Sequence, residues 1–227
     1  MTPMQTPHIL YEHPDFILIN KPSGISFHSD NGPGIVVIMQ TALQRKLYAV
    51  HRLDKMTSGL LLLATSSEAA ARFTNMFETR QIEKYYLAIS LRKPKKKQGW
   101  IKGDMAASRR GSYKLLPTCN APAVTQFVST ALRTHERLFL VKPHTGKTHQ
   151  IRVALKSLGA PIAGDIRYAN SAEATKEERG YLHAYALHFS YQERPFYFTC
   201  KPDKSERFLS SEFQKALHLY AHPWECF

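Results

Sequence analysis

The stretch His51-Arg52-Leu53-Asp54-Lys55-Met56-Thr57-Ser58-Gly59 runs directly into the apolar segment Leu60-Leu61-Leu62-Leu63-Ala64. A short apolar run bounded by turn residues is typical of a buried β-strand. Asp54 is therefore expected on a loop that a core strand holds in place, the usual setting of functional side chains. The alternative is that Asp54 pairs with Arg52 or Lys55 and only closes a turn. This stretch alone does not decide between the two interpretations.

The composition favours an enzyme that acts on an anionic partner. The chain has 227 residues, 43% of them hydrophobic, so it can bury a sizeable core in one or two domains. Its 31 Lys and Arg against 18 Asp and Glu give a formal charge of +13, which indicates a polyanion such as a nucleic acid. A generically basic, soluble protein is the alternative.

The three cysteines, Cys119, Cys200 and Cys226, have no paired spacing, so neither a disulfide framework nor a zinc site is predicted. His144 and His149 are five residues apart without neighbouring acids, and no metal is assigned. A reducing cytoplasm fits this cysteine content best. No signal peptide and no run of about 18 apolar residues is found, so secretion and membrane spanning are not expected.

Periodicity predicts a mixture of strands and helices in one domain covering residues 1–227, with a C-terminal strand and helix in 191–227. Strands are expected at 9–11, 16–19, 60–64, 82–89, 124–128, 138–141 and 196–198. Helices are expected at 35–47, after a cap at Ser67, at 151–158 with Gly159 as the stop, and at 208–220. The basic stretch 92–114 is interpreted as mostly solvated loop.

Two positions in these elements suggest a site. Alternation along the strand 82–89 places Tyr85 and Tyr86 on opposite faces, so that one tyrosine faces the core and the other can face a site. Arg152 lies about 100° round the helix from the buried Ile151, from where its guanidinium could reach a carboxylate at the edge of the core. A solvated arginine is equally compatible with the periodicity. Gly146-Lys147-Thr148 lacks the upstream glycine of a P-loop, so no nucleotide cofactor is predicted.

Four blocks in order resemble the RluA family of RNA pseudouridine synthases, over roughly residues 9–190. They are Ile17-Leu18-Ile19-Asn20-Lys21-Pro22-Ser23-Gly24, His51-Arg52-Leu53-Asp54 with Thr57-Ser58-Gly59-Leu60, Lys84-Tyr85-Tyr86-Leu87-Ala88, and Thr145-Gly146-Lys147-Thr148-His149-Gln150-Ile151-Arg152. The last block continues into Gly159-Ala160-Pro161-Ile162-Ala163-Gly164-Asp165 and Tyr168, and Leu182-His183-Ala184 resembles a further block. The likeness implies an α+β pseudouridine synthase fold, with a central, mixed but mostly antiparallel sheet flanked by helices and a catalytic cleft over the sheet.

The resemblance also implies the reaction and the residues for it. Uridine in ribosomal or transfer RNA would be isomerised to pseudouridine, a reaction that needs no metal or cofactor. Asp54 would be the essential residue, kept ionised by Arg152, with Tyr86 against the uracil. Arg52 would fill the gap that the extruded base leaves, and His51, Thr57 and Leu182 would line the substrate pocket.

Some positions depart from the family pattern, and they put the choice of substrate in doubt more than the activity. Lys147 replaces a common arginine, Ala154 a frequent histidine, and no His-Pro pair follows Phe189. No separate N-terminal S4 domain is expected, so the catalytic domain itself would contact RNA. Candidates for phosphate contacts are Lys21, Lys95, Lys96, Lys97, Arg109, Arg110 and Lys147. A monomer is the default expectation. The alternatives are a non-catalytic RNA-binding or RNA-chaperone protein and, more remotely, a hydrolase.

Overall fold

One large mixed sheet runs through the whole molecule. The computed structural model describes residues 6–29 and 32–227. Neighbouring strands follow the order β1-β2-β4-β11-β5-β10-β9-β6, while β12 pairs with β11 and β3 pairs with β4. The strands are β1 (Ile9–His13), β2 (Phe16–Lys21), β3 (Tyr48–Ala49), β4 (Ser58–Ala64), β5 (Glu83–Ser90), β6 (Gln98–Gly103), β9 (Ala123–Ala131), β10 (Arg137–Pro143), β11 (Leu182–Tyr191) and β12 (Arg194–Thr199). Every pair is antiparallel except β4 with β11, so the expected mixed, mostly antiparallel sheet is confirmed.

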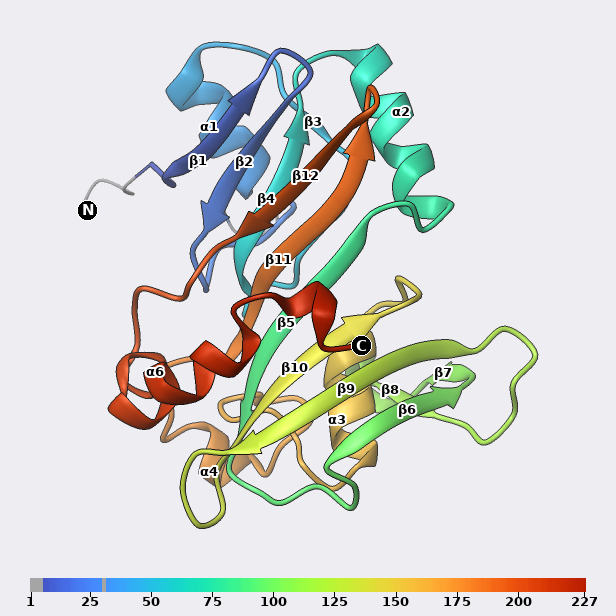
Figure 1. Cartoon of the computed structure of the whole chain (residues 1–227), viewed down its shortest axis with the longest axis vertical. Helices are drawn as coiled ribbons and strands as arrows, with labels where there is room; N and C mark the ends of the chain where they lie inside the picture. Colours follow the sequence, from blue (N-terminus) through green and yellow to red (C-terminus); the bar gives the residue numbers. More distant parts are fainter. Residues whose placement is uncertain (1–5, 30–31) are drawn as a thin grey trace.

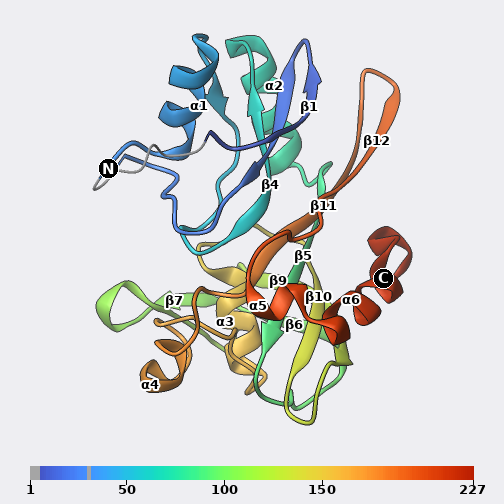
Figure 2. The ribbon, with the colours of Figure 1, turned by 90° about the vertical axis from the view of Figure 1, so that its left-hand side faces the viewer.

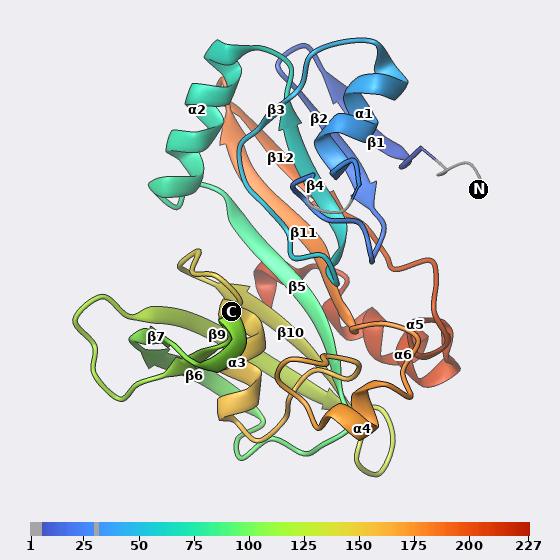
Figure 3. The same cartoon turned by 180° about the vertical axis from the view of Figure 1, so that it is seen from behind.

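The upper half of the sheet in Figure 1 is built around β4. All seven residues of β4 are buried, because β2 pairs along one edge and helices cover one face. Seen from behind, α1 (Ile35–Leu43) and α2 (Ser67–Glu78) lie over this half (Figure 3). A strand buried on both faces shows a continuous apolar run instead of alternation. The buried strand predicted from Leu60–Ala64 is thereby confirmed.

The lower half is organised around β5, β10 and β9, with α3 (Gln150–Ser157) packed on one face. Figure 2 shows β11 passing from this half into the upper one, and the C-terminal helices α5 (Glu206–Leu209) and α6 (Ser211–Leu217) lie beside the lower part of β11. The parallel contact of β4 with β11 brings the start of β4 to the middle of the molecule. At this contact Gly59 has φ +104, and an added Cβ would lie 2.2 Å from the carbonyl oxygen of Ala184. Only glycine fits there.

Four predictions of secondary structure need correction. The helix from residue 35 ends at Leu43, because Gln44 adopts a left-handed conformation. The predicted helix 208–220 is interrupted at Ser210, whose extended backbone ends α5 (Glu206–Leu209) and whose hydroxyl caps α6 (Ser211–Leu217). The stretch 92–114 contains β6 and the small hairpin β7 (Met105–Ala107) and β8 (Tyr113–Leu115). β7 and β8 have only three residues each, too few to show alternation, and in β6 only Ile101 and Gly103 are buried. Ser66, and not Ser67, caps α2.

No helix in the two described ranges is long and apolar enough to cross a membrane.

Candidate active site

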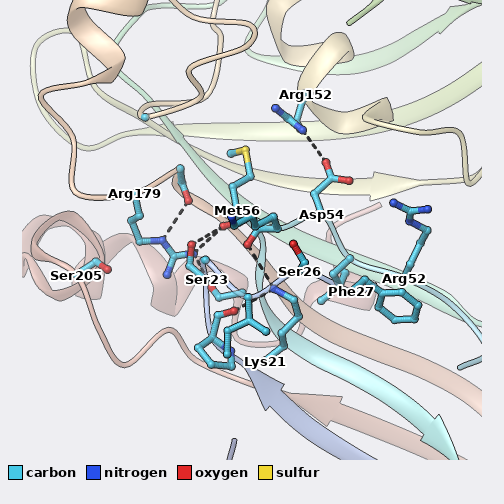
Figure 4. A pocket seen from close by; sticks show the side chains of 18 of the residues that line it. Lys21, Ser23, Ser26, Phe27, Arg52, Asp54, Met56, Arg152, Arg179 and Ser205 are labelled. Atoms are coloured by element: carbon cyan, nitrogen blue, oxygen red, sulfur yellow. Dashed lines mark hydrogen bonds and ion pairs between the residues drawn. The ribbon is translucent and has the colours of Figure 1, made fainter. Parts of the chain in front are cut away.

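The loop that carries Asp54 lies between β3 and β4, at the middle of the molecule. Its main chain is fixed by side chains from distant parts of the sequence. Ser23 Oγ donates to the Met56 carbonyl (2.8 Å), and Lys21 Nζ donates to the carbonyl oxygens of Lys55 (3.4 Å) and Thr57 (2.8 Å). Figure 4 shows Lys21, Ser23 and Met56 grouped beneath the loop. Because three consecutive carbonyls are held, the position of Asp54 is set by the core rather than by solvent.

Lys21 does not lie where the sequence prediction placed it. Its side chain is fully buried, and its ammonium also donates to the Pro22 carbonyl (3.0 Å). Burial lowers the pKa of Lys21 to about 7; the positive charge of Arg179 lowers it as well, and Asp54 opposes the shift. An ammonium that is buried and turned inward onto carbonyl oxygens supports the loop rather than facing the cleft, which argues against the predicted phosphate contact of Lys21.

Arg152 meets Asp54 at this loop from the first turns of α3. Its Nη1 donates to Asp54 Oδ2 at 2.9 Å, a bond drawn in Figure 4. Arg152 is buried, whereas the side chain of Asp54 retains 20% exposure and so stays accessible to a substrate. The position of Arg152 on the helix, about 100° from Ile151, therefore places it in an ion pair with Asp54, as expected. The side chain of Asp54 pairs with Arg152 and not with Arg52 or Lys55, so the alternative of a simple turn does not hold.

A second carboxylate shares the guanidinium and was not singled out from the sequence. Asp165 is completely buried and accepts from Arg152 Nε (2.7 Å) and Nη2 (2.8 Å). It also accepts from the main-chain N–H groups of Arg167 and Tyr168. Burial alone would lower the pKa of Arg152, but hydrogen bonds with Asp165 and the charges of Asp165 and Asp54 outweigh it and raise the pKa. The only signal for Asp165 was its place in the Gly164-Asp165 block.

His149 and Tyr168 complete the surroundings of Arg152, and the sequence prediction missed both. The ring of Tyr168 lies 4.9 Å from the guanidinium, and its hydroxyl is 2.9 Å from His149 Nδ1. His149 Nε2 lies 3.9 Å from Asp54 Oδ2. Burial lowers the pKa of His149 although the charge of Asp54 opposes this. A largely neutral imidazole thus lies beside the carboxylate.

Two cavities meet at Asp54. A cavity of about 530 Å³ is lined by Asp54, Tyr86, Arg152 and Leu182, and a larger cleft of about 1560 Å³ opens on the other side. Arg52, Leu53, Asp54, His149 and Arg152 line both. A pocket of several hundred Å³ is the size of an ordinary ligand site.

Tyr86 is the tyrosine that faces the smaller cavity, while Tyr85 is buried. Burial and the negative charge of Asp54 raise the pKa of the Tyr86 phenol above its usual value. The phenol is therefore protonated at neutral pH and can donate a hydrogen bond.

The other predicted residues are distributed unevenly around the cavities. Thr57 and Leu182 are buried in the wall of the smaller cavity, and exposed Lys147 lies at its rim. His51 also lines it, but its Nε2 accepts from the Leu62 main chain (3.0 Å) and its ring stacks on Phe77, so it mainly supports β4. Arg52 is exposed at the junction.

The predicted phosphate contacts divide into two groups. Arg109 and Arg110, at the tip of the β7–β8 hairpin, line the larger cleft. Lys95, Lys96 and Lys97 line neither cavity: the Lys95 main chain bonds to Leu158, at the C-terminal end of α3, whereas His149 and Arg152 lie at its start. The structure brings Arg109, Arg110 and Lys147 to the cavities and leaves the lysine run apart from them.

Comparisons with known proteins agree with this fold. Residues 15–157 match the family model for RNA pseudouridylate synthases. The chain is 46% identical over 214 residues to an "Uncharacterized RNA pseudouridine synthase" of Haemophilus influenzae, covering 93% of this chain and 95% of that protein. It is 33% identical to a ribosomal large subunit pseudouridine synthase C of Rickettsia bellii (79% of this chain, 62% of that protein). It is also 33% identical to a tRNA pseudouridine synthase C of Pasteurella multocida (82% and 86%).

Among solved structures, human RNA pseudouridylate synthase domain containing 4 aligns with a TM-score of 0.72 and 26% identity, over 92% of this chain and 91% of that one. The fold and the matches define an RNA-modifying isomerase. The chain belongs to the RNA pseudouridylate synthase family, as its four sequence blocks predicted, and its reaction is the isomerisation of uridine to pseudouridine in RNA. The comparisons do not support a non-catalytic RNA chaperone.

Proposed function

We propose that Asp54 is the catalytic carboxylate and that it acts on a uridine of ribosomal or transfer RNA held in the 530 Å³ cavity. The observation that carries this proposal is the 2.9 Å bond from Arg152 to Asp54 at the wall of that cavity. The guanidinium compensates the charge of a carboxylate that is largely withdrawn from water. One oxygen of Asp54 is engaged by Arg152, and the remaining exposure of the side chain leaves it open to the substrate.

The reaction separates N1 of uracil from the sugar, turns the base and joins the sugar to C5, after which the C5 proton is lost and N1 is protonated. Asp54 would attack the sugar, add to the ring or act as a base on the sugar. Tyr86, whose phenol keeps its proton, would stack on the uracil or donate to it, and could move a proton. Leu182 and Thr57 would form the walls that exclude water.

A base inside folded RNA must be extruded before it can reach such a cavity, at a cost of a few kcal/mol. Arg52 is exposed where the cavity meets the larger cleft, a suitable place to fill the gap in the stack. The larger cleft, with Arg109 and Arg110, would receive the flanking RNA backbone. The names of the relatives support both ribosomal and transfer RNA as substrates.

Replacing Asp54 by Asn tests this assignment, because it keeps the shape of the side chain and removes its charge. RNA from cells that lack the gene would be incubated with each protein, digested to nucleosides and analysed for pseudouridine. We expect the variant to bind the RNA nearly as well as the wild type and to make no pseudouridine. A variant that still forms product would refute the role of Asp54.

The cellular location and the oligomeric state of the enzyme are separate proposals. All three cysteines are free thiols, which suits the reducing cytoplasm. A monomer is proposed as the working form, which sedimentation analysis at enzyme concentrations would test.

A further inference from the structure

β6 is the edge strand of the lower half of the sheet (Figure 1), and it carries an exposed tryptophan, Trp100. Along β6, Ile101 points into the core, while Trp100 and Lys102 share the opposite face. The side chain of Trp100 is 49% exposed, although a large aromatic residue at a sheet edge gains from being covered. Neither the fold nor the reaction described above uses this ring.

Trp100 is held in place by His144, which connects it to the active site. The two rings stack with centroids 4.8 Å apart and an angle of 30°. His144 is itself fixed, since its Nε2 is 3.1 Å from Gln126 Oε1 and its main chain donates to the Val124 carbonyl. Burial and the nearby cations lower the pKa of His144, so its ring is neutral at pH 7. His144 belongs to the wall of the cavity that holds Asp54, so the stacked pair extends from that wall to the surface.

Three positive side chains lie near the pair or line the same cavity. Lys102 Nζ lies 5.1 Å from the centre of the Trp100 ring, and Lys147 and Arg80 line the same cavity as His144. Within residues 6–29 and 32–227, no carboxylate lies within salt-bridge distance of these three cations. Lys142, by contrast, is neutralised by Glu83 at 2.6 Å. An exposed aromatic face with unpaired cations nearby is complementary to a nucleobase with its phosphates.

We propose that Trp100, supported by His144, is a stacking platform for an unpaired base of the RNA that flanks the target uridine. Lys102, Lys147 and Arg80 bind the neighbouring phosphates. The inference rests on the proposed function insofar as it takes RNA as the substrate, and it extends the substrate to a single-stranded segment beside the flipped uridine. A fully paired segment would hide its base faces and could not use the platform.

Tryptophan fluorescence gives a direct readout. The chain has two tryptophans, so Trp224→Phe leaves Trp100 as the only emitter. This variant would be titrated with a short oligouridylate and with a fully paired RNA duplex of the same length. We expect the single strand to quench the emission and the duplex to leave it nearly unchanged. Binding of the oligouridylate without quenching, or equal quenching by the duplex, would overturn the platform.

Affinity measurements with matched variants complete the test. We expect Trp100→Ala to weaken oligouridylate binding by about 5- to 150-fold, and Trp100→Phe to keep most of the affinity. Tyr197 is the control, because it is another exposed aromatic residue (51%) stacked on a histidine, His188, and it lines neither cavity. Tyr197→Ala should bind normally. Unchanged affinity in Trp100→Ala, or an equal loss in Tyr197→Ala, would refute the proposal.

The outcome is separable from that of the catalytic assignment. Asp54→Asn in the Trp224→Phe background should still show quenching, because the platform does not depend on turnover. Quenching in an Asp54→Asn protein that still makes pseudouridine would leave the platform standing and refute the proposed role of Asp54. Full affinity in a Trp100→Ala protein that makes pseudouridine normally would refute the platform and leave the proposed function unchanged.

Discussion

Arg152 gives two of its N–H groups to Asp165 and only one to Asp54. The bonds to Asp165 Oδ2 and Oδ1 are 2.7 and 2.8 Å long, and they leave Nη1 directed at Asp54 Oδ2. Two bonds from a planar guanidinium to one carboxylate fix its plane as well as its position. The buried carboxylate therefore determines how the guanidinium meets the accessible one.

The first prediction follows from this division. In Asp165→Asn, an amide oxygen in place of Oδ1 can keep the bonds from Arg152 Nη2 and from the two main-chain N–H groups, but the amide NH2 in place of Oδ2 faces Arg152 Nε. The guanidinium then loses one of its two bonds to this side chain and with it its fixed orientation. We expect kcat for pseudouridine formation to fall by about 10- to 100-fold with little change in KM, and the free energy of unfolding to fall by about 3 kcal/mol. Steady-state kinetics well below the melting temperature and urea unfolding would measure both.

Asp104→Asn is the matched control. Asp104 also accepts from two main-chain N–H groups, of Asn120 and Ala121, but lines neither cavity. It should leave kcat unchanged. A normal kcat in Asp165→Asn would show that the second carboxylate does not position Arg152.

The second prediction concerns Lys21, whose ammonium lies under the catalytic loop. Lys21→Met keeps much of the side-chain volume but removes the donor of the Thr57 carbonyl, and it leaves the Lys55 carbonyl with only the Gly24 N–H. We expect a loss of about 1 to 3 kcal/mol in the free energy of unfolding and a lower kcat, because the loop that carries Asp54 loosens. The salt dependence of RNA binding should not change, since the ammonium of Lys21 is directed at main-chain carbonyls. The exposed Lys97, changed to Met, should alter neither stability nor kcat. A shallower salt dependence in Lys21→Met would restore Lys21 as an RNA contact.

Local patterns predicted the elements that bury apolar residues. The run Leu60–Leu63 could only be a core strand or a short buried helix, and the helical spacing of Ile151, Ala154 and Leu155 fixed α3 and thus the direction of Arg152. The tyrosine alternation in β5 was sufficient to separate Tyr86 from Tyr85. These features depend on neighbours in the sequence, which is why the sequence reveals them.

Contacts between irregular segments that are distant in the sequence could not be predicted from local patterns. Asp165 binds Arg152 from a loop without periodicity, and the inward direction of Lys21 depends on the fold of residues 55–57. The parallel pairing of β4 with β11 joins Ser58 to His183, 125 residues apart, and no local pattern specifies such a partner. The break between α5 and α6 at Ser210 was also not predicted, because the helical spacing of apolar residues continues across it.

The third prediction separates the two groups of basic residues. Removing both Arg109 and Arg110 by substitution with Ala should make log K for RNA binding less dependent on log salt, with the slope reduced by about one to two. Changing Lys95, Lys96 and Lys97 to Ala together removes more charge but should reduce the slope much less, because these residues line neither cavity. Filter binding over a range of salt concentrations would measure both slopes. A larger effect of the lysine substitutions would place the RNA path along the lower end of the sheet.

The fourth prediction concerns acid stability and depends on His183 beneath the catalytic loop. His183 is 1% exposed, and its two ring nitrogens are each 2.7 Å from a partner, Ser58 Oγ and the Cys200 carbonyl. The carbonyl can only accept, so Nε2 carries the proton and Nδ1 accepts from Ser58. Burial lowers the pKa of His183 to about 4, while the bond to Cys200 opposes this shift.

The sign of the effect follows from proton uptake. Between pH 6.5 and about 4 the unfolded chain protonates this histidine and the folded chain does not, so the unfolded state binds more protons and stability falls as the pH falls. The full difference corresponds to about 3 kcal/mol. Urea unfolding at several pH values would measure the loss. His183→Gln retains one donor and one acceptor but cannot titrate. The plot of its free energy of unfolding against pH should therefore be flatter by the equivalent of about one proton. The remaining acid sensitivity comes from groups such as His51, whose pKa burial lowers to about 3. Equal slopes for the wild type and His183→Gln would mean that His183 is already protonated in the folded protein.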